Sequence, residues 1–598
     1  MIQFPMEDAE QFFRSYSIGR FTVSEDEGKL IFSTNLNGHS NLWAMDLPNL
    51  SPYPLTYCNQ SSNFIEMDSL NRFILAGFDK DGDENYHIYA LKPEGGGLLE
   101  LIPAGETEKD YFVHLTEDGE RLYYVTSKDN PMFLNSRCYN IRTKEDTLLL
   151  TGVETPTYVE AVSPNESSYI VLKSYSNTYN VGYVKKGEEL ICIVPSSEKE
   201  HTIGSICYID ENTVIFVTNY EEEFSYVASF DLNKQEFKPI CKIEKEDISD
   251  IKWHAETKNG YIVSSKGVTD RLYKFVWDKK ELILLNSPVD TISQIEITKS
   301  ENLYLLGESA TKTANIYYKK NRDTEWAALT KNYVIGLSES SFVEPDVITY
   351  ASFDGLNIEA LLFRAKGEVQ NGYTIFWPHG GPQSAETKDF RALFQYLLRQ
   401  GYNIFAPNFR GSTRYGSTFT KMIEGDWGEA PRLDCVAGME WLFEQGISTP
   451  DKLFVMGGSY GGYMTLLLHG RHSEYFRAAI DIFGPSNLFS FIESMPENWK
   501  PLAVNLIGDI NNDKDKDKLI QDSPITYLNQ MNKPLLIIQG ANDPRVVKEE
   551  SDQIFHALQE QGVDVEYLVL DDEGHGFSKK ENEIYVYRRI TEFLAKHK

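Results

Sequence analysis

The sequence predicts two domains: an N-terminal seven-bladed β-propeller and a C-terminal α/β-hydrolase domain whose sheet is doubly wound and mostly parallel. A chain of 598 residues is too long for one hydrophobic core. A strand motif recurs about every 45 residues between positions 20 and 340. Strand-like and helix-like segments then alternate to the C-terminus, which indicates βα units. We therefore expect a short extension over 1–19, the propeller over 20–340 and the hydrolase domain over 341–598.

Each repeat contains a short strand with a polar turn upstream of it. Four strands per unit at this spacing are typical of a propeller blade. The competing interpretation, a pair of all-β sandwiches, would space its strands less evenly. Seven motifs predict seven blades, and their central residues are Trp43, Tyr89, Tyr139, Tyr183, Ala228, Tyr273 and Tyr317.

A change of pattern marks both ends of the propeller. We expect a helix over Met6 to Tyr16 that packs back on the hydrolase domain, and a junction around Ser338 to Ser341. After the junction, Asp354-Gly355 between two apolar segments indicates a hairpin. Helices are predicted over Ala392 to Gln400, Cys435 to Glu444 and Glu583 to Lys596.

A Gly-x-Ser-x-Gly motif lies at 457–461, after the apolar strand Lys452 to Met456 and before the helix-like stretch Met464 to His469. A serine at such a strand-to-helix turn takes a strained backbone conformation, and flanking glycines avoid collisions with strand and helix. The alternative is a glycine-rich turn with a solvated serine. We interpret Ser459 as a nucleophile because a matching acid and base follow it.

A serine hydroxyl needs a base, and the base needs an orienting carboxylate. In the α/β-hydrolase fold these residues follow in the order Ser, Asp, His, each after a core strand. Asp543 follows the strand Pro534 to Ile538, and His575 follows the strand Val565 to Leu570. Each residue alone has an ordinary structural explanation, but both at strand ends in this order predict a catalytic triad.

An oxyanion hole is predicted after the strand Tyr373 to Trp377. Backbone N–H groups there, with the N–H of the residue after the nucleophile, can hold a developing oxyanion. We assign the donors to Gly381 and Tyr460, and we expect His379 to hold the loop.

Arg410 is the residue that we expect to orient the substrate. It follows a strand that ends in Ala406-Pro407-Asn408, which places it at the same sheet edge as the triad. The alternative is a structural salt bridge across the domain interface, and both could hold.

The order of these motifs resembles the prolyl oligopeptidase family of serine peptidases, and most of all its acylaminoacyl-peptidase branch, over residues 345–598. Two departures are Val547, where the family usually has proline, and Arg414, which replaces a common glycine. The resemblance implies a propeller over the hydrolase domain and a short or acylated peptide as substrate. The motifs that carry it are His379 to Pro382, Asn408 to Gly416, Asp426 to Gly428, Gly457 to Tyr463, Ser523-Pro524 and the segments around Asp543 and His575.

The composition of the chain narrows the range of binding partners and locations that we expect. A formal net charge of −31 argues against nucleic acid or an anionic membrane surface. The six cysteines lack Cys-x-x-Cys spacing, so we expect neither a disulfide framework nor a metal site. No signal peptide or long apolar run is evident, so we expect a cytoplasmic protein. The predicted chemistry requires no cofactor, and the oligomeric state stays open, a homo-oligomer included.

These features predict a serine hydrolase that cleaves short peptides, including release of an N-acylated or N-terminal amino acid, through an acyl-enzyme. A carboxylesterase is the first alternative, because esters and amides pass through the same kind of tetrahedral intermediate. A propeller interaction module with an inactive hydrolase domain is the second, although the set Ser459, Asp543, His575 and Gly381 is intact.

Overall fold

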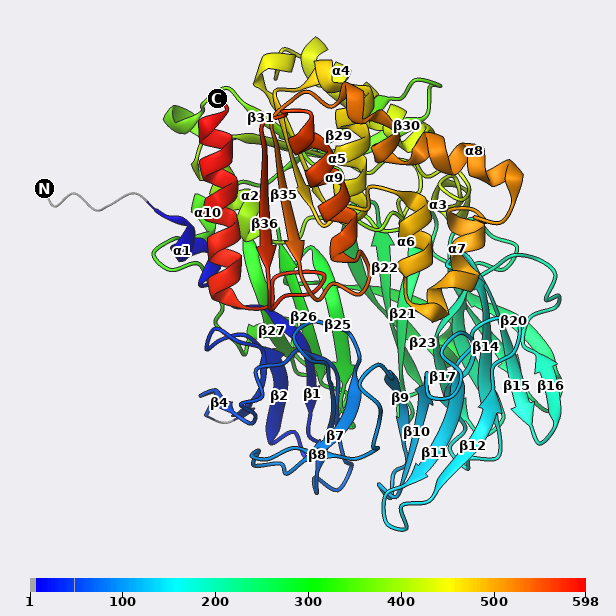
Figure 1. Ribbon diagram of the computed structural model, residues 1–598. Coiled ribbons are helices and arrows are strands. Elements are labelled where there is room, and N and C mark those ends of the chain that lie inside the picture. Colours follow the sequence, from blue (N-terminus) through cyan, green and yellow to red (C-terminus); the bar gives the residue numbers. More distant parts are fainter. Residues whose placement is uncertain (1–6, 48) are drawn as a thin grey trace, which may run out of the picture.

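The N-terminal part of the structure is a ring of seven four-stranded antiparallel sheets (Figure 1). The computed structural model describes residues 7–47 and 49–598. Strands follow one another in sequence order across each sheet, so every blade is a meander. The predicted seven-bladed propeller is therefore confirmed. The blades span 18–54, 62–100, 110–151, 157–192, 203–241, 247–285 and 291–328.

The seven repeat motifs all lie on the third strand of their blades. Side chains of this strand pack against the neighbouring sheets: Ala228 is fully buried, and Tyr139 and Tyr273 are nearly so. The even spacing in the sequence thus reflects one equivalent position in each blade. The third strands are β3 (Asn41–Asp46), β7 (His87–Leu91), β11 (Asn135–Asn140), β15 (Tyr179–Lys186), β19 (Tyr226–Asp231), β23 (Thr269–Val276) and β27 (Lys312–Lys319).

The ring closes between the first and the last blade through side chains. Gln294, on β25 (Thr291–Ile297), accepts a hydrogen bond from Phe21 N at 3.2 Å and donates one to Phe21 O at 2.8 Å. Apolar side chains of both blades, among them Phe32 and Leu306, form one cluster around this contact. The ring therefore closes without a strand shared between the two ends of the propeller.

The C-terminal part is one eight-stranded sheet with helices on both faces (Figure 1). Its order is β29-β30-β32-β31-β33-β34-β35-β36. β30 runs antiparallel to both of its neighbours, and all pairs from β32 onward are parallel. The strands are β29 (Asp346–Ala351), β30 (Asn357–Phe363), β31 (Thr374–Phe376), β32 (Asn403–Pro407), β33 (Leu453–Gly458), β34 (Ala478–Ile482), β35 (Leu535–Gly540) and β36 (Val565–Leu570).

Two hydrophobic clusters cover the two faces of this sheet. One contains buried side chains of α4, α5 and α9, and the other contains those of α1, α2 and α10. This is the doubly wound arrangement that the sequence predicts. The helices named here are α1 (Ala9–Phe13), α2 (Ala392–Arg399), α4 (Ala430–Glu444), α5 (Tyr460–Arg471), α9 (Lys548–Glu560) and α10 (Lys580–Lys596).

The chain contacts the hydrolase domain before it enters the propeller. On α1, the ring centroid of Phe12 lies 5.4 Å from that of Tyr396 on α2. The ring of Phe13 stacks on that of Tyr587 on α10, with 4.3 Å between the centroids. Met6, the predicted start of this helix, lies outside the described residues.

The two segments that join the domains run side by side. The side chain of Asn332 accepts a hydrogen bond from Tyr16 N at 3.1 Å and donates one to Tyr16 O at 2.6 Å. Tyr16 precedes the first blade and Asn332 follows the last. The propeller is therefore inserted between α1 and β29, with both of its ends fastened at one place.

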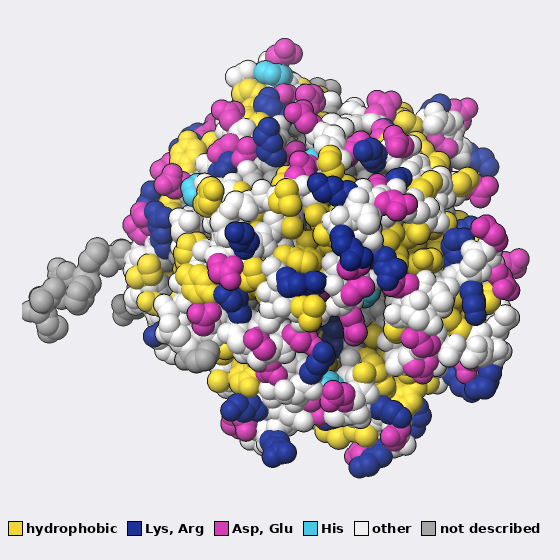
Figure 2. Space-filling view, turned by 90° about the horizontal axis from the view of Figure 1, so that it is seen from below, with side chains coloured by type: hydrophobic (Ala, Val, Ile, Leu, Met, Phe, Trp, Pro, Cys, Tyr) yellow, Lys and Arg dark blue, Asp and Glu magenta, His cyan; other side chains and the backbone are white. Residues whose placement is uncertain are grey.

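The outer face of the propeller carries acidic and basic side chains interspersed with apolar ones (Figure 2). Within the described residues, no helix is long and apolar enough to cross a membrane.

Candidate active site

Ser459 lies at the turn between β33 and α5, with φ 57° and ψ −123°. A non-glycine residue with positive φ is strained and is held there by its surroundings. A Cβ atom at Gly457 would lie 2.4 Å from Gly461 O, and one at Gly461 would lie 2.1 Å from Pro378 O. Both positions therefore require glycine, and the turn holds Ser459 at the carboxyl end of the central strand.

The structure brings the three predicted triad residues together. His575 Nε2 lies 2.9 Å from Ser459 Oγ, and His575 Nδ1 lies 2.6 Å from Asp543 Oδ2. Asp543 Oδ1 accepts hydrogen bonds from the backbone N–H groups of Arg545 and Val546, each at 2.9 Å. With Nδ1–H donated to this fixed carboxylate, Nε2 is left to accept a proton from the serine hydroxyl.

The two predicted oxyanion donors border the same cavity. Gly381 and Tyr460 both line it together with Ser459. A Cβ atom at Gly380 would lie 3.5 Å from Ser459 Cβ, so this loop passes directly beside the nucleophile. Gly381 and Tyr460, at the start of α5, therefore both lie close to the nucleophile.

His379 contacts the loop and not the cavity. Its Nε2 lies 2.8 Å from Ser412 Oγ, and its ring stacks 4.2 Å from Phe409. Complete burial lowers the pKa of His379 to about 4, so the imidazole is neutral at neutral pH. It fixes the loop that carries Gly381.

Beside Ser459 the cavity is largely apolar and has a volume of about 220 Å³. Its walls come from the segment after α3 (Ser417–Lys421), from α6 (Leu488–Ser494) and from α7 (Lys500–Leu506). A small apolar cavity next to the nucleophile can accept an apolar side chain of a substrate. The wall residues include Trp427, Phe491, Met495, Trp499, Leu506 and Ile507.

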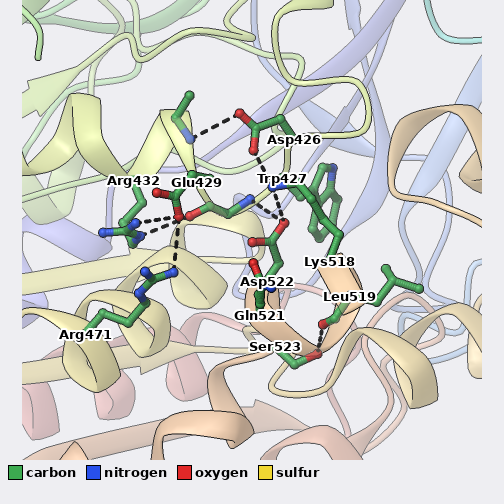
Figure 3. Close-up of polar contacts among 12 residues, drawn as sticks. Asp426, Trp427, Glu429, Arg432, Arg471, Lys518, Leu519, Gln521, Asp522 and Ser523 are labelled. Atoms are coloured by element: carbon green, nitrogen blue, oxygen red, sulfur yellow. Dashed lines mark hydrogen bonds and ion pairs between the residues drawn. The ribbon is translucent and has the colours of Figure 1, made fainter. Parts of the chain in front are cut away.

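A network of charges behind this wall fixes Trp427 (Figure 3). Lys518, on α8 (Asp513–Asp522), lies 2.7 Å from Asp426 and 3.3 Å from Asp522. Asp522 Oδ2 accepts a hydrogen bond from Gly428 N at 3.3 Å. The alternating charges of 513–518 therefore belong to a helix that also holds the wall of the cavity.

The expectation that Arg410 orients the substrate is wrong in this structure. Its guanidinium makes hydrogen bonds of 2.7–2.9 Å with Asp434 and of 3.0–3.1 Å with Asp354, and the residue is only 7% exposed. Arg410 is not among the residues that line the cavity. Both partners belong to the hydrolase domain, so the ion pairs do not cross the domain interface either. Because the guanidinium already donates hydrogen bonds to these two carboxylates, it is not free to bind a substrate.

Replacing Arg410 by alanine is therefore expected to lower the free energy of unfolding of the hydrolase domain by about 3–5 kcal/mol, because Asp434 would remain buried without its partner. Urea unfolding followed by tryptophan fluorescence measures this. Arg364→Ala is the matched control: its ion pair with Asp346 is exposed, and we expect a change of about 0.5 kcal/mol or less. An unchanged stability together with a raised KM would restore the substrate-binding role.

Arg545 is the guanidinium that the structure places at the cavity. It lines the cavity with Ser459, and its Nε lies 2.8 Å from Glu84 of the propeller. It is not among the predicted site residues, although it stands two positions after Asp543 on the same loop. That proximity to a triad residue is the signal that could have identified it.

Arg414 connects the loop after β32 to the propeller. Its Nη1 donates to Gly267 O at 3.0 Å, and its Nη2 lies 2.5 Å from Asp270. Its φ of 79° lies in the left-handed region, where glycine is easier to accommodate. The arginine thus gains an interdomain contact at a position with a strained backbone.

The fold and the arrangement of Ser459, His575 and Asp543 are those of a serine hydrolase with an α/β-hydrolase domain. Residues 388–598 match the sequence profile described as the prolyl oligopeptidase family. A peptidase of Mycobacterium tuberculosis described as puromycin-hydrolyzing superimposes with a TM-score of 0.83 over 99% of this chain and 96% of that chain, at 16% identity. The C-terminal domain of this chain is thus similar to the prolyl oligopeptidase family.

Two relatives with different described activities are similar to parts of this chain. Dipeptidyl aminopeptidase BIII of Pseudoxanthomonas mexicana is 34% identical over 50% of this chain and 45% of its own length. The acylamino-acid-releasing enzyme of Arabidopsis thaliana is 29% identical over 40% of this chain and 32% of its own length. The matched segments thus cover less than half of either relative.

Proposed function

We propose that this protein is a serine peptidase that cleaves short peptides through an acyl-enzyme intermediate. The observation that carries the proposal is the hydrogen-bonded series Ser459–His575–Asp543 beside an apolar cavity. The relatives named above are described as dipeptidyl or acylamino-acid-releasing enzymes, and this supports a fragment from the amino end of the peptide as the released product.

Ser459 Oγ attacks the scissile carbonyl carbon, and its proton passes to His575 Nε2. Asp543 stabilises the imidazolium through Nδ1–H, and the N–H groups of Gly381 and Tyr460 stabilise the oxyanion, at a few kcal/mol per donor. The tetrahedral intermediate collapses when the leaving amine takes the proton from His575, which leaves an acyl group on Ser459. Water, deprotonated by His575, then attacks this ester and releases the acid.

The cavity beside Ser459 supports an apolar residue at the acyl side of the scissile bond. An aspartate side chain there would lose its hydration, and Arg545 at the edge of the cavity is already paired with Glu84, so burying the charge costs several kcal/mol. We expect aminoacyl anilides with leucine, methionine or phenylalanine to be cleaved at least about tenfold faster than those with aspartate, measured as kcat/KM.

A cavity-filling substitution checks this assignment. Ala503, on α7, is buried against the cavity, and Val504 beside it is 48% exposed. Ala503→Trp is expected to reduce kcat/KM for a phenylalanine substrate more than for an alanine substrate, whereas Val504→Trp is the matched control. An equal loss on both substrates would contradict a side-chain pocket at this place.

A carboxylesterase remains the alternative, because the apolar cavity accepts a small acyl group equally well. Comparing an N-acetyl-aminoacyl anilide with a short-chain nitrophenyl ester separates the two. Efficient ester hydrolysis with no detectable anilide hydrolysis would establish the esterase. Failure of a fluorophosphonate to label Ser459 would overturn both functions and leave an interaction module with an inactive hydrolase domain.

A further inference from the structure

The aromatic ring of Phe483 lies against the imidazole of His575. The two ring centroids are 4.6 Å apart, and the ring planes are tilted by 48°. Phe483 is the first residue after β34, and His575 lies on the loop after β36. The two nitrogen atoms of the imidazole contact Ser459 and Asp543. The phenylalanine therefore occupies a side of the imidazole that neither of these residues uses.

The backbone of Phe483 is strained, with a φ of 44°. A bulky residue takes this left-handed conformation only where its surroundings impose it. The N–H of Phe483 donates to Ile538 O at 2.8 Å. Asp481 Oδ1 accepts a hydrogen bond from Gly484 N at 2.9 Å. The turn is therefore fixed both at Phe483 and at the residue that follows it.

This turn also packs against the first turn of α5. A Cβ atom at Gly484 would lie 2.3 Å from Gly462 C, and one at Gly462 would lie 2.4 Å from Asp481 Oδ1. Gly462 stands three positions after the nucleophile Ser459. The helix that begins at the nucleophile thus also holds the turn that carries Phe483. Strained residues that are held in this way are concentrated at functional sites.

Phe483 does not belong to the wall of the substrate cavity. Among the described residues that line this cavity is Pro485, two positions further on, but not Phe483. The ring of Phe483 instead packs on Phe577, with 5.9 Å between the centroids, and on the hydrophobic cluster of one sheet face. Any effect of Phe483 on the reaction should therefore act through His575 and not through substrate binding.

The charge of the imidazole changes during the reaction. His575 takes the proton of Ser459 and becomes an imidazolium, whose side chain is only 7% exposed. The face of an aromatic ring is negative and attracts a cation that lies within about 6 Å of its centroid, more strongly where water is excluded. A neutral imidazole gains much less from this contact. The interaction is therefore stronger in the transition state than in the free enzyme, which is what accelerates a reaction.

We propose that Phe483 is a positioning residue for His575 and that its aromatic face stabilises the imidazolium that forms when Ser459 loses its proton. The inference rests on the proposed peptidase function and adds a residue to its mechanism. The proton of the serine hydroxyl moves to Nε2 of His575, and the electron pair that it leaves on Oγ forms the bond to the carbonyl carbon. No bond forms to Phe483, which acts on the charge alone.

The test uses the full-length enzyme with Phe483 replaced by phenylalanine that carries one, two or three ring fluorines. Fluorine withdraws electron density from the face of the ring and changes its shape little. We expect kcat on an aminoacyl anilide to fall with each fluorine, to about one tenth with three, while KM changes less than about twofold. Phe483→Leu should lose a similar factor, and Phe483→Tyr should stay close to the wild type.

Phe577 is the matched control. Its ring lies 5.9 Å from that of Phe483 and 6.0 Å from that of Tyr587. In the part of the chain that the structure describes, the aromatic ring in contact with His575 is that of Phe483. The same fluorinated residues at position 577 should leave kcat within about twofold of the wild type. Thermal unfolding of each variant verifies that the fold is kept.

Three outcomes would overturn the proposal: a kcat that does not change along the fluorine series, an equal loss at Phe577, or a KM that rises as kcat falls. Fluorophosphonate labelling of Ser459 needs the same proton transfer but no peptide, so its rate should fall by the same factor. Slower labelling along the series, in an enzyme that cleaves no anilide, would reject the peptidase function and keep this inference. Labelling and cleavage that are both insensitive to fluorination would reject this inference alone.

Discussion

Replacing Ser459 by alanine is expected to reduce kcat by about 10⁴- to 10⁶-fold while the protein keeps its fold. The loss should be this large because the alanine removes the only atom that forms the acyl-enzyme, and what remains is binding and oxyanion stabilisation. Ser459 is fixed by the backbone turn between β33 and α5, not by its hydroxyl, so stability should change little. Initial rates on an aminoacyl anilide, with thermal unfolding in parallel, measure both quantities.

His575→Ala should cost a similar factor, and the double variant should be little worse than either single one. Residues that act as one unit show this non-additivity, because removing one disables the others. Losses that simply multiply in the double variant would mean that one of the two residues acts independently, and the triad assignment would then be incorrect.

The second large effect that we expect is a dependence of the cleavage rate on substrate size. Short peptides should be cleaved at least about 100-fold faster than folded proteins, because the propeller covers the crevice at the carboxyl ends of the strands. Hydrolase residues contact several blades around the site. Gly38 O accepts from Lys580 N at 3.1 Å, Tyr175 O accepts from Asn505 at 3.0 Å, and Glu223 O accepts from Ser417 N at 2.8 Å. A ring held at such separate points leaves no open groove for a folded chain.

The measurement compares a peptide of about 10 residues, which spans about 35 Å when extended, with a folded and an unfolded protein at equal concentration of susceptible bonds. An interior cavity of about 590 Å³ between the propeller and residues 413–420 offers space for part of such a peptide. Cleavage of the unfolded protein at the rate of the peptide would contradict size selection by the propeller and would leave the triad untouched.

The sequence predicts what is encoded locally. The repeat of a strand every 45 residues or so and the order Ser459, Asp543, His575 each follow from short patterns, and the structure matches the fold and brings these side chains together. Arg410 was misassigned because its partners Asp354 and Asp434 are distant in the sequence. No local sequence pattern shows that two distant carboxylates will form ion pairs with this guanidinium.

The turn between the second and third strands of the second blade illustrates a further limit. It resembles many other polar turns of the propeller, and only its docking against Gly574 places it beside the loop that carries His575. Such a contact depends on how two complete domains pack, which no short segment encodes. The same holds for Lys518, whose role depends on Asp426 from a distant loop.

The paired connections at Tyr16 and Asn332 also determine how the two domains can separate. Because both connections lie at one place, we expect the two domains to separate by rotating about that place. The gap would widen most on the opposite side of the ring, around the third to fifth blades. An opened molecule also keeps its halves at a high effective concentration, so reclosure over a captured peptide is an intramolecular step that does not depend on protein concentration.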